Sequence, residues 1–172
     1  MTAITTHIPT LTTERLTLRA PEARDAGAYA DFYASARSEI IGGPLDLKRA
    51  WKVLTNDAGH WMLRGFGWWV LDVTGGARAV GSVGFHLPEG ERDVELGWSL
   101  FSGEGHGYAT EAARAALDWA ATAHPDWTRL VSHIDRTNVA SQRVAARLGA
   151  TDTGEATPHN PDCNVWLHGA AA

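Results

Sequence analysis

The sequence predicts one α/β (α+β) domain in which helices flank a mixed, mostly antiparallel sheet. The chain has 172 residues, of which 44% are hydrophobic and 20% charged, and this composition suits a single domain over residues 1–172. Three strand patterns follow one another between residues 68 and 101 with short turns between them, which predicts an antiparallel meander. This antiparallel meander excludes a purely parallel doubly wound sheet, and the helical patterns before and after it predict helices packed on a mixed sheet.

The first third of the chain predicts one strand and two helices. Residues 15–19 alternate polar and apolar side chains, as a strand does. Pro21 opens a helix that we expect to reach about Ala36. Asp46 is a suitable N-cap for a second helix. The expected apolar stripe of that helix is Leu47, Trp51, Leu54, Ala58 and Trp61.

The meander and the last third of the chain supply the remaining elements. The meander strands are expected at 68–73, 79–87 and 93–101. In the third of these strands one face carries Val94, Leu96, Trp98 and Leu100, and the other carries Glu95, Gly97 and Ser99. Helices are expected at 108–123 and 138–149, and strands at 127–134, after 151 and at 164–167. The inward faces of the two helices are expected to be Tyr108, Ala112, Ala115 and Trp119, and Ala140, Val144 and Leu148.

Charge and cysteine content exclude several classes of protein. The formal net charge is −5, and we expect no nucleic-acid partner because such binding needs a clustered basic face. The one cysteine, Cys163, excludes an intramolecular disulfide and a multi-cysteine zinc site. No apolar run approaches the roughly 20 residues of a membrane span. Residues 1–10 are expected to form a loose tail, and the polar N-terminus does not resemble a secretory signal, so we expect a cytoplasmic protein with no membrane partner.

A glycine-rich stretch between a predicted strand and a predicted helix carries the strongest chemical signal. It reads Gly103-Glu104-Gly105-His106-Gly107-Tyr108-Ala109. Its glycines permit positive φ, and the N–H groups at the start of a helix attract an anion. A P-loop would need Gly-Lys-Ser/Thr here, and a dinucleotide fingerprint would need an early βαβ unit, so neither fits. A phosphate-bearing ligand and a plain strand-to-helix turn remain as interpretations.

A second motif resolves this choice. Asn138 and Ser141 form an Asn-x-x-Ser helix start, and Leu148-Gly149 ends the same helix. With both motifs the sequence resembles the GNAT superfamily of acetyl-CoA-dependent N-acetyltransferases, and above all the branch of the ribosomal-protein N-terminal (alanine) acetyltransferases. The family motif Q/R-x-x-G-x-G/A corresponds to Glu104–Ala109, and the branch's extended Gly-Tyr-Ala-Thr-Glu-Ala form to 107–112.

The resemblance extends from about Leu11, because residues 11–19 are similar to the first strand of that branch. Glu104 departs from the usual Gln or Arg at the first motif position. Its carboxylate would repel a pyrophosphate, so we expect it to point away from the ligand and leave the binding to backbone N–H groups.

The resemblance implies a GNAT-like fold with a splayed-strand cleft and acetyl-CoA as the cosubstrate. The residues implied in acetyl-CoA binding are Leu100, Phe101, Gly105, His106, Gly107, Tyr108, Ala109, Asn138 and Ser141. The N–H of Leu100 is the candidate donor to the oxyanion. No metal is implied, and His159 with Cys163 gives two ligand types in a polar loop rather than a metal site.

The chemistry implied is direct attack of an amine on the thioester, which needs a base and an acid. Glu95 is the leading base, acting through an ordered water, with His86 and then His133 as alternatives. Ser141 is the candidate acid for the departing thiolate, although it also occupies the first turn of a helix that Asn138 caps. Residues expected to line the amine site are Ile40, Trp68, His86 and Trp98.

The acceptor and the assembly stay open at this point. The expected partner is a small-molecule amine or a protein N-terminus, and the chain is expected to act as a monomer or homodimer. Two other classes also remain: a non-catalytic acyl-CoA-binding sensor that keeps the phosphate cradle but lacks a working base, and an interaction module on the same fold.

Overall fold

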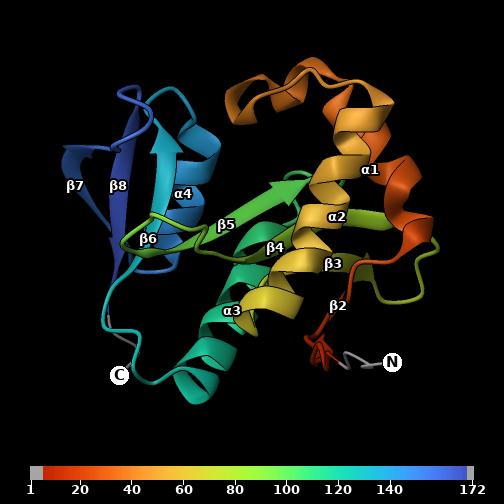
Figure 1. The fold of residues 1–172 in the computed structure, drawn as a ribbon, viewed down its shortest axis with the longest axis horizontal. Coiled ribbons are helices and arrows are strands. Elements are labelled where there is room, and N and C mark those ends of the chain that lie inside the picture. The colour runs from red at the N-terminus through yellow and green to blue at the C-terminus, as the bar shows by residue number, and fades with distance from the viewer. Residues whose placement is uncertain (1–5, 170–172) are drawn as a thin grey trace.

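The computed structural model describes residues 6–169, and residues 1–5 of the predicted tail lie outside the described part. The described residues form one eight-stranded sheet in the order β1-β2-β3-β4-β5-β6-β8-β7 (Figure 1). The strands are β1 (Leu11–Thr12), β2 (Leu16–Arg19), β3 (Trp68–Val73), β4 (Ala79–His86), β5 (Val94–Leu100), β6 (Leu130–Asp135), β7 (Thr151–Ala156) and β8 (Cys163–His168). Neighbouring strands are antiparallel except β5 and β6, which are parallel, so the predicted mixed sheet is confirmed.

Helices cover both faces of this sheet. The α-helices are α1 (Ala26–Tyr33), α2 (Leu47–Arg64), α3 (Tyr108–Ala123) and α4 (Val139–Arg147), and two 3-10 helices are η1 (Ala23–Asp25) and η2 (Ala36–Ile41). Helix α3 lies against the face of β3–β5 from which Trp69, Phe85 and Leu96 project. Helices α1 and α2 lie over the other face, where Phe32 and Leu54 pack with Val70. No helix of residues 6–169 is long and apolar enough to cross a membrane.

The N-terminal segment differs from the single strand that the sequence predicts. A turn closed by the Thr13 N–H and the Leu16 carbonyl splits it into β1 and β2, which pair as a small hairpin. Residues 6–10 of the predicted loose tail have no regular structure, yet the Pro9 carbonyl accepts a hydrogen bond from Trp69 Nε1 at 2.8 Å. This end of the described chain is therefore held against the core.

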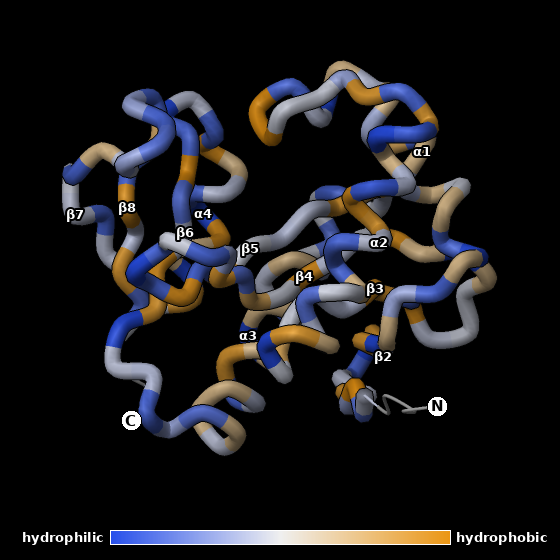
Figure 2. The backbone as a smooth tube through the Cα atoms, in the orientation of Figure 1, coloured by the Kyte–Doolittle hydropathy of each residue, from blue (hydrophilic) through white to orange (hydrophobic). Residues whose placement is uncertain are grey.

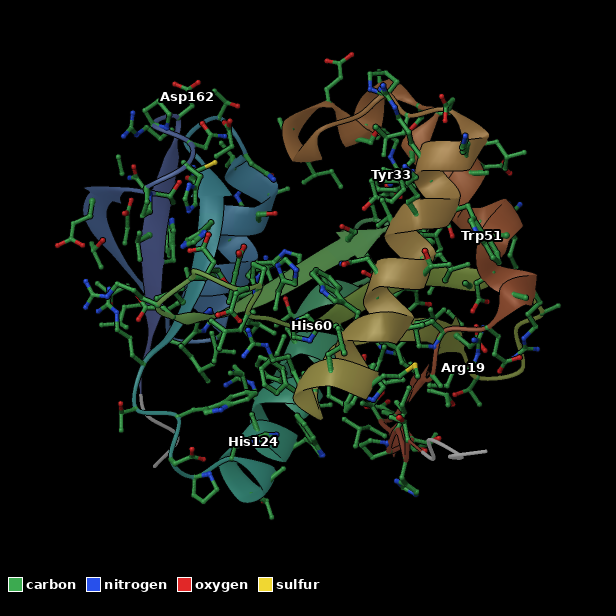
Figure 3. The ribbon with its side chains drawn as sticks, in the orientation of Figure 1. Arg19, Tyr33, Trp51, His60, His124 and Asp162 are labelled. Atoms are coloured by element: carbon green, nitrogen blue, oxygen red, sulfur yellow. The ribbon has the colours of Figure 1, made fainter. Side chains whose placement is uncertain are left out.

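The predicted buried stripe of α2 is wrong at its first turns. Leu47 is 69% exposed and Trp51, labelled in Figure 3, is 44% exposed. The buried face consists of Ala50, Leu54, Asp57, His60 and Trp61. The apolar pattern did not reveal this face because the face includes Ala50, which is small, and Asp57, which is charged. Asp57 can be buried because Tyr29 of α1 donates a 2.7 Å hydrogen bond to its carboxylate.

Three further boundaries and faces also depart from the predictions. The helix expected to reach Ala36 ends at Tyr33, because the chain continues into η2. Strand β6 begins at Leu130 rather than Trp127, whose indole instead stacks on His124 with 4.1 Å between ring centroids. Ala140 of α4 is exposed rather than inward.

Alanines make the inward face of α3 narrower than expected. Its buried residues are Ala109, Ala112, Ala113, Ala116 and Ala120, while Tyr108 and Trp119 lie at the margin of the core. Small side chains let the helix backbone approach the sheet closely.

Hydropathy differs between the centre and the edge of the sheet. Apolar residues lie on the central strands, whereas the edge strand β7 is mostly hydrophilic and all of its residues are exposed (Figure 2). A polar edge of this kind discourages pairing with another chain.

Candidate active site

Strands β5 and β6 part soon after they meet, and this fork creates the site. They pair only through Val94 with Leu130 and Glu95 with Val131. Beyond the fork, the Phe101 N–H of β5's continuation donates to Val80 of β4, so the backbone groups of Leu100 point the other way, into the gap. The predicted splayed strand is confirmed, and beyond the fork no strand among residues 6–169 pairs with this edge of β5.

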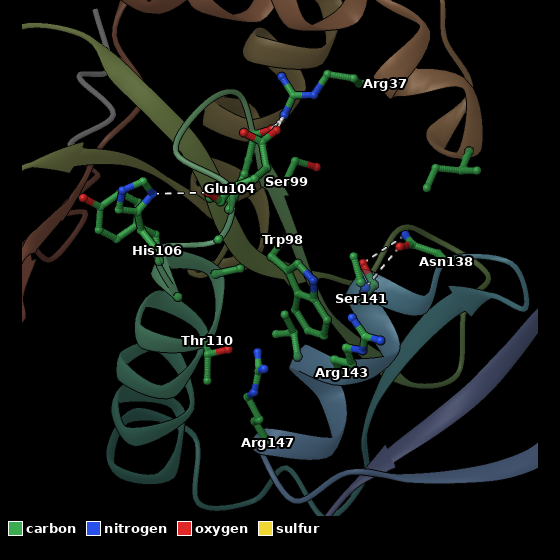
Figure 4. A pocket seen from close by; sticks show the side chains of 18 of the residues that line it. Arg37, Trp98, Ser99, Glu104, His106, Thr110, Asn138, Ser141, Arg143 and Arg147 are labelled. Carbon is green, nitrogen blue, oxygen red and sulfur yellow. Dashed lines mark hydrogen bonds and ion pairs between the residues drawn. The ribbon is translucent and has the colours of Figure 1, made fainter.

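A cavity of about 780 Å³ occupies this gap (Figure 4). It is bounded by η2, the end of β5, the glycine-rich loop with the start of α3, and the first turns of α4. Its lining residues are Phe32, Arg37, Ile40, Ile41, Trp98, Ser99, Leu100, Glu104, Gly105, His106, Gly107, Tyr108, Ala109, Thr110, Asn138, Ala140, Ser141, Arg143, Val144 and Arg147. The cavity therefore brings together both sequence motifs, which lie about 30 residues apart in the chain.

The glycine-rich loop alternates in backbone handedness. Gly103, Gly105 and Gly107 have φ of 75°, 84° and 82°, while no non-glycine residue among those described has positive φ. Alternation of this kind turns successive N–H groups toward one side and makes a nest for an anion. Helix α3 begins directly after Gly107, so its free N–H groups and positive dipole end add to the nest.

Thr110 adds a side-chain group to this anion site. It lies in the first turn of α3 and lines the cavity, and Figure 4 shows it on the helix that faces α4. Its Oγ1 is buried and has no hydrogen-bond partner among the described residues. A buried hydroxyl without a partner is costly, so a ligand atom that accepts its proton would be stabilised here.

Residues from the N-terminal hairpin hold the far side of the loop. Arg15 donates through Nε to Glu111 at 2.8 Å and through Nη1 to the His106 carbonyl at 2.9 Å. The Thr13 hydroxyl donates to the other oxygen of the same carboxylate at 2.6 Å. Burial acts to raise the pKa of Glu111, but the hydrogen bonds that its carboxylate accepts from Thr13 and Arg15, together with the Arg15 charge, lower this pKa below its ordinary value. Glu111 is therefore an ionised anchor for the loop.

Arg37 of η2 holds the near side of the loop. Its guanidinium donates to the Leu100 and Phe101 carbonyls, each at 2.7 Å, and forms an ion pair with Glu104. Figure 4 shows the Glu104 carboxylate turned toward Arg37. One arginine thus joins η2, the end of β5 and the first motif residue.

Helix α4 provides the opposite wall. The Asn138 side chain accepts a hydrogen bond from the Ser141 N–H at 3.1 Å, which caps the helix, and its amide donates to Ser141 Oγ at 3.0 Å. The Ser141 oxygen therefore already accepts a hydrogen bond from Asn138. Its hydroxyl proton is not donated to any described residue. Arg143 and Arg147 are exposed on the same wall, and neither forms an ion pair with any described residue.

The candidate bases lie together on the α1–α2 face of the sheet, at the fork. His86, Glu95 and His133 come from adjacent strands β4, β5 and β6, and we call them the Glu–His cluster. His86 pairs with Glu95 across β4 and β5, and His133 Nδ1 lies 3.3 Å from Glu95 Oε2. Glu95 raises the pKa of His133, whereas burial lowers the pKa of His86. None of the three is among the residues that line the cavity.

The other predicted residues divide between the two faces. Ile40 lines the cavity from η2 and is 45% exposed. Trp98 also lines it, but from the α3–α4 face of β5. Trp68 lies against Gly97 on the opposite face, where a Cβ on that glycine would come within 2.5 Å of the indole. Phe101 turns away from the cavity and packs on Tyr29 and Phe32.

Sequence reasoning missed several side chains of the cavity. Thr110 follows the motif directly and could have been found from its place in the first helical turn. Arg143 and Arg147 recur four residues apart on α4, a spacing that puts two cations on one helix side. Arg37 had no signal, because nothing in a short 3-10 segment indicates that it returns to a loop more than 60 residues away.

Comparisons with known proteins agree with this arrangement. Residues 15–151 match the model of an acetyltransferase (GNAT) domain. An acetyltransferase from Agrobacterium tumefaciens is 38% identical, with 98% of each chain covered and a TM-score of 0.87.

Two more distant structures share the fold. The ribosomal-protein-S5-alanine acetyltransferase from Vibrio fischeri is 17% identical, with 93% of this chain and 95% of that chain covered and a TM-score of 0.69. The microcin C7 self-immunity acetyltransferase MccE, solved in complex with acetyl-CoA and AMP, is 16% identical, with 90% and 92% covered and a TM-score of 0.71. The family match and the 38% identical relative show that this chain belongs to the GNAT acetyltransferases and is an acyltransferase.

Proposed function

We propose that this acyltransferase transfers the acetyl group of acetyl-CoA to a primary amine, by direct attack of the amine within a ternary complex. One observation carries the proposal: a single cavity joins a phosphate-sized anion nest at Gly103–Gly107 to the unpaired backbone edge of β5. A pyrophosphate on the nest and an amide-bearing arm along the strand edge are the two parts of a CoA molecule that these features suit.

The residues that would hold the cosubstrate have complementary chemistry. The N–H groups of the loop and of the first turn of α3 suit the pyrophosphate, and the Thr110 hydroxyl suits one of its oxygens. Arg143 and Arg147 supply positive charge for further phosphate oxygens. The structure of MccE with acetyl-CoA and AMP shows that this fold accommodates the cosubstrate in that protein.

The chemical step asks three things of this chain. The Leu100 N–H, which faces the gap, stabilises negative charge on the thioester oxygen as the amine attacks. Glu95 takes the ammonium proton through an ordered water. Ser141 donates its proton to the thiolate, and the Asn138 amide orients its hydroxyl by occupying the oxygen. Acetyl-CoA supplies the activated acyl group.

The amine site is proposed on the α1–α2 side of the fork. Trp68 gives an aromatic surface beside the Glu–His cluster, and Ile40 closes the cavity from η2. Glu95 and the net charge of −5 favour an acceptor that is a cation before it reacts. A small amine and a protein N-terminus both meet this description.

An isotope-transfer screen tests the proposed function. Labelled acetyl-CoA is incubated with the protein and, in parallel, amino acids, polyamines and N-terminal peptides, and labelled amide is counted. Label on at least one amine is expected. CoA binding by calorimetry without transfer to any amine would instead support an acyl-CoA sensor, and absence of CoA binding would support an interaction module.

A matched pair of variants tests the position of the phosphates. Thr110→Asp puts a carboxylate into the proposed anion site, and like-charge repulsion should weaken CoA binding by at least about tenfold. An acidic residue in a first helical turn favours the helix, so folding should survive. Thr110→Asn is the uncharged control and should weaken binding far less. If the two variants bound CoA with equal Kd, the phosphates would not lie at the start of α3.

A further inference from the structure

A carboxylate stands where the proposed cosubstrate brings phosphates. Glu104 lies between Gly103 and Gly105, two of the three glycines of the anion nest, and lines the same cavity. Its side chain is 57% exposed. An unpaired carboxylate at this place would repel a pyrophosphate and oppose the nest.

Arg37 is placed to cancel that charge. It comes from η2, outside both sequence motifs, and its guanidinium forms an ion pair with Glu104. The same group donates to the Leu100 and Phe101 carbonyls at 2.7 Å and lies 5.3 Å from the Phe32 ring centroid. These four contacts fix a planar, permanently charged group at one position, which a lone exposed ion pair would not do.

We propose that Arg37 is a positioning residue which neutralises Glu104 and thereby determines how tightly the glycine-rich loop holds the pyrophosphate of CoA. The inference rests on the proposed function, since it names a residue that controls the cosubstrate half of the same site. A residue of η2, on the side of the cavity assigned to the amine, thus controls how tightly the pyrophosphate binds on the other side.

A purely mechanical role is the competing explanation. Because Arg37 also bonds to two carbonyls at the end of β5, its loss could weaken CoA binding by loosening the strand end. The two roles differ in one respect: only the charge role makes the effect of losing Arg37 depend on the charge of Glu104 and on the phosphates of the ligand.

A double-mutant cycle separates them. The proteins are the unmodified chain, Arg37→Met, Glu104→Gln and the double variant, and the measurement is the Kd of CoA by calorimetry at low and high salt. We expect Arg37→Met to weaken binding about tenfold, Glu104→Gln to tighten it by less than about twofold because Arg37 already cancels its charge, and the double variant to return within about twofold of the unmodified chain, where additive effects would leave most of the tenfold loss. Salt should shrink the tenfold loss, because screening weakens exposed charges.

A truncated acyl donor gives the second readout. S-acetylpantetheine carries the thioester arm without the phosphates, so Arg37→Met should leave its kcat/KM within about twofold while lowering that of acetyl-CoA. A double variant as weak as Arg37→Met, or equal losses with both donors, would overturn the charge role in favour of the mechanical one. If the unmodified chain binds no CoA, both the proposed function and this inference fail. If it binds CoA and the cycle is additive, this inference alone fails.

Discussion

The two sides of the fork between β5 and β6 carry different kinds of chemical group. The α3–α4 side presents mainly backbone N–H groups, from three glycines and a helix start, and the proposed function assigns the phosphates of CoA to them. The α1–α2 side carries titratable side chains from separate strands, above all the Glu–His cluster, which lies at the fork and outside the cavity lining. Backbone recognition varies little with pH, whereas recognition by carboxylates and imidazoles follows their protonation. We therefore expect CoA binding and amine chemistry to respond differently to mutation and to pH.

The largest effect is expected from Glu95→Gln. The amide keeps the shape of the side chain but cannot take a proton, so kcat should fall about a hundredfold or more while the Kd of CoA changes little. The loss should shrink at high pH, where more of the amine is already deprotonated. Steady-state kinetics across pH with calorimetry of CoA provide the measurement.

The same variant has a spectroscopic consequence on its own side of the fork. Glu95 raises the pKa of His133, so the substitution should lower that pKa, as followed by NMR of the imidazole protons. If both the pKa of His133 and kcat stayed unchanged, Glu95 would not be the base, and His86 would be favoured instead.

Ser141→Ala is expected to have the next largest effect, on the other side. It removes the proposed acid, and kcat should fall by up to about a hundredfold. The backbone N–H that Asn138 caps is retained, so stability should hold. CoA affinity should change by no more than one hydrogen bond, about 1 kcal/mol. Normal turnover would mean that solvent protonates the thiolate and that Ser141 only begins a helix.

A buried carboxyl behind the α1–α2 side should make the stability of that side depend on pH. Burial raises the pKa of Asp57 from 3.8 to about 7 in the folded chain, against the lowering effect of the Tyr29 hydrogen bond. Between these values the folded state keeps a proton that the unfolded state has released, so the free energy of unfolding falls as pH rises from about 4 to about 7.

Asp57→Asn tests this because an amide cannot titrate. Relative to the unmodified chain, the variant should gain about 2 kcal/mol of stability between pH 5 and pH 8. Urea unfolding at the two pH values measures the gain. A constant difference between the two proteins would show that Asp57 has the same pKa in both states.

The smallest effect is expected from Asn138→Ala. Loss of the cap should lower the free energy of unfolding by about 1 kcal/mol. The Ser141 hydroxyl also loses its donor, so kcat should fall, but less than in Ser141→Ala. Urea unfolding and kinetics measure the two losses. Equal kcat values for Asn138→Ala and the unmodified chain would show that Asn138 does not orient the hydroxyl.

The same contrast explains how much the sequence could predict. The glycine-rich loop, the cap at Asn138 and the meander are local patterns, in which a few adjacent residues determine backbone shape. The fork was predicted only through the family resemblance, since the pairing of β5 with β6 depends on residues 36 positions apart, such as Val94 and Leu130. Arg37 was missed because its partners belong to another element, and the first turns of α2 were misjudged because the buried face contains Asp57, whose burial depends on Tyr29.

The hydrogen bonds between Arg15 and Glu111 also constrain the order in which the parts of the chain fold. These residues are 96 positions apart, and between them lie the meander and both helices of the α1–α2 side. Contacts over such distances close large loops and form slowly. The N-terminal hairpin, although synthesised first, gains these partners only once α3 exists. A ligand on the loop should consequently slow amide hydrogen exchange in β1 and β2. The exchange rate of the N-terminal hairpin would then report whether its contact with Glu111, 96 positions later in the chain, has formed.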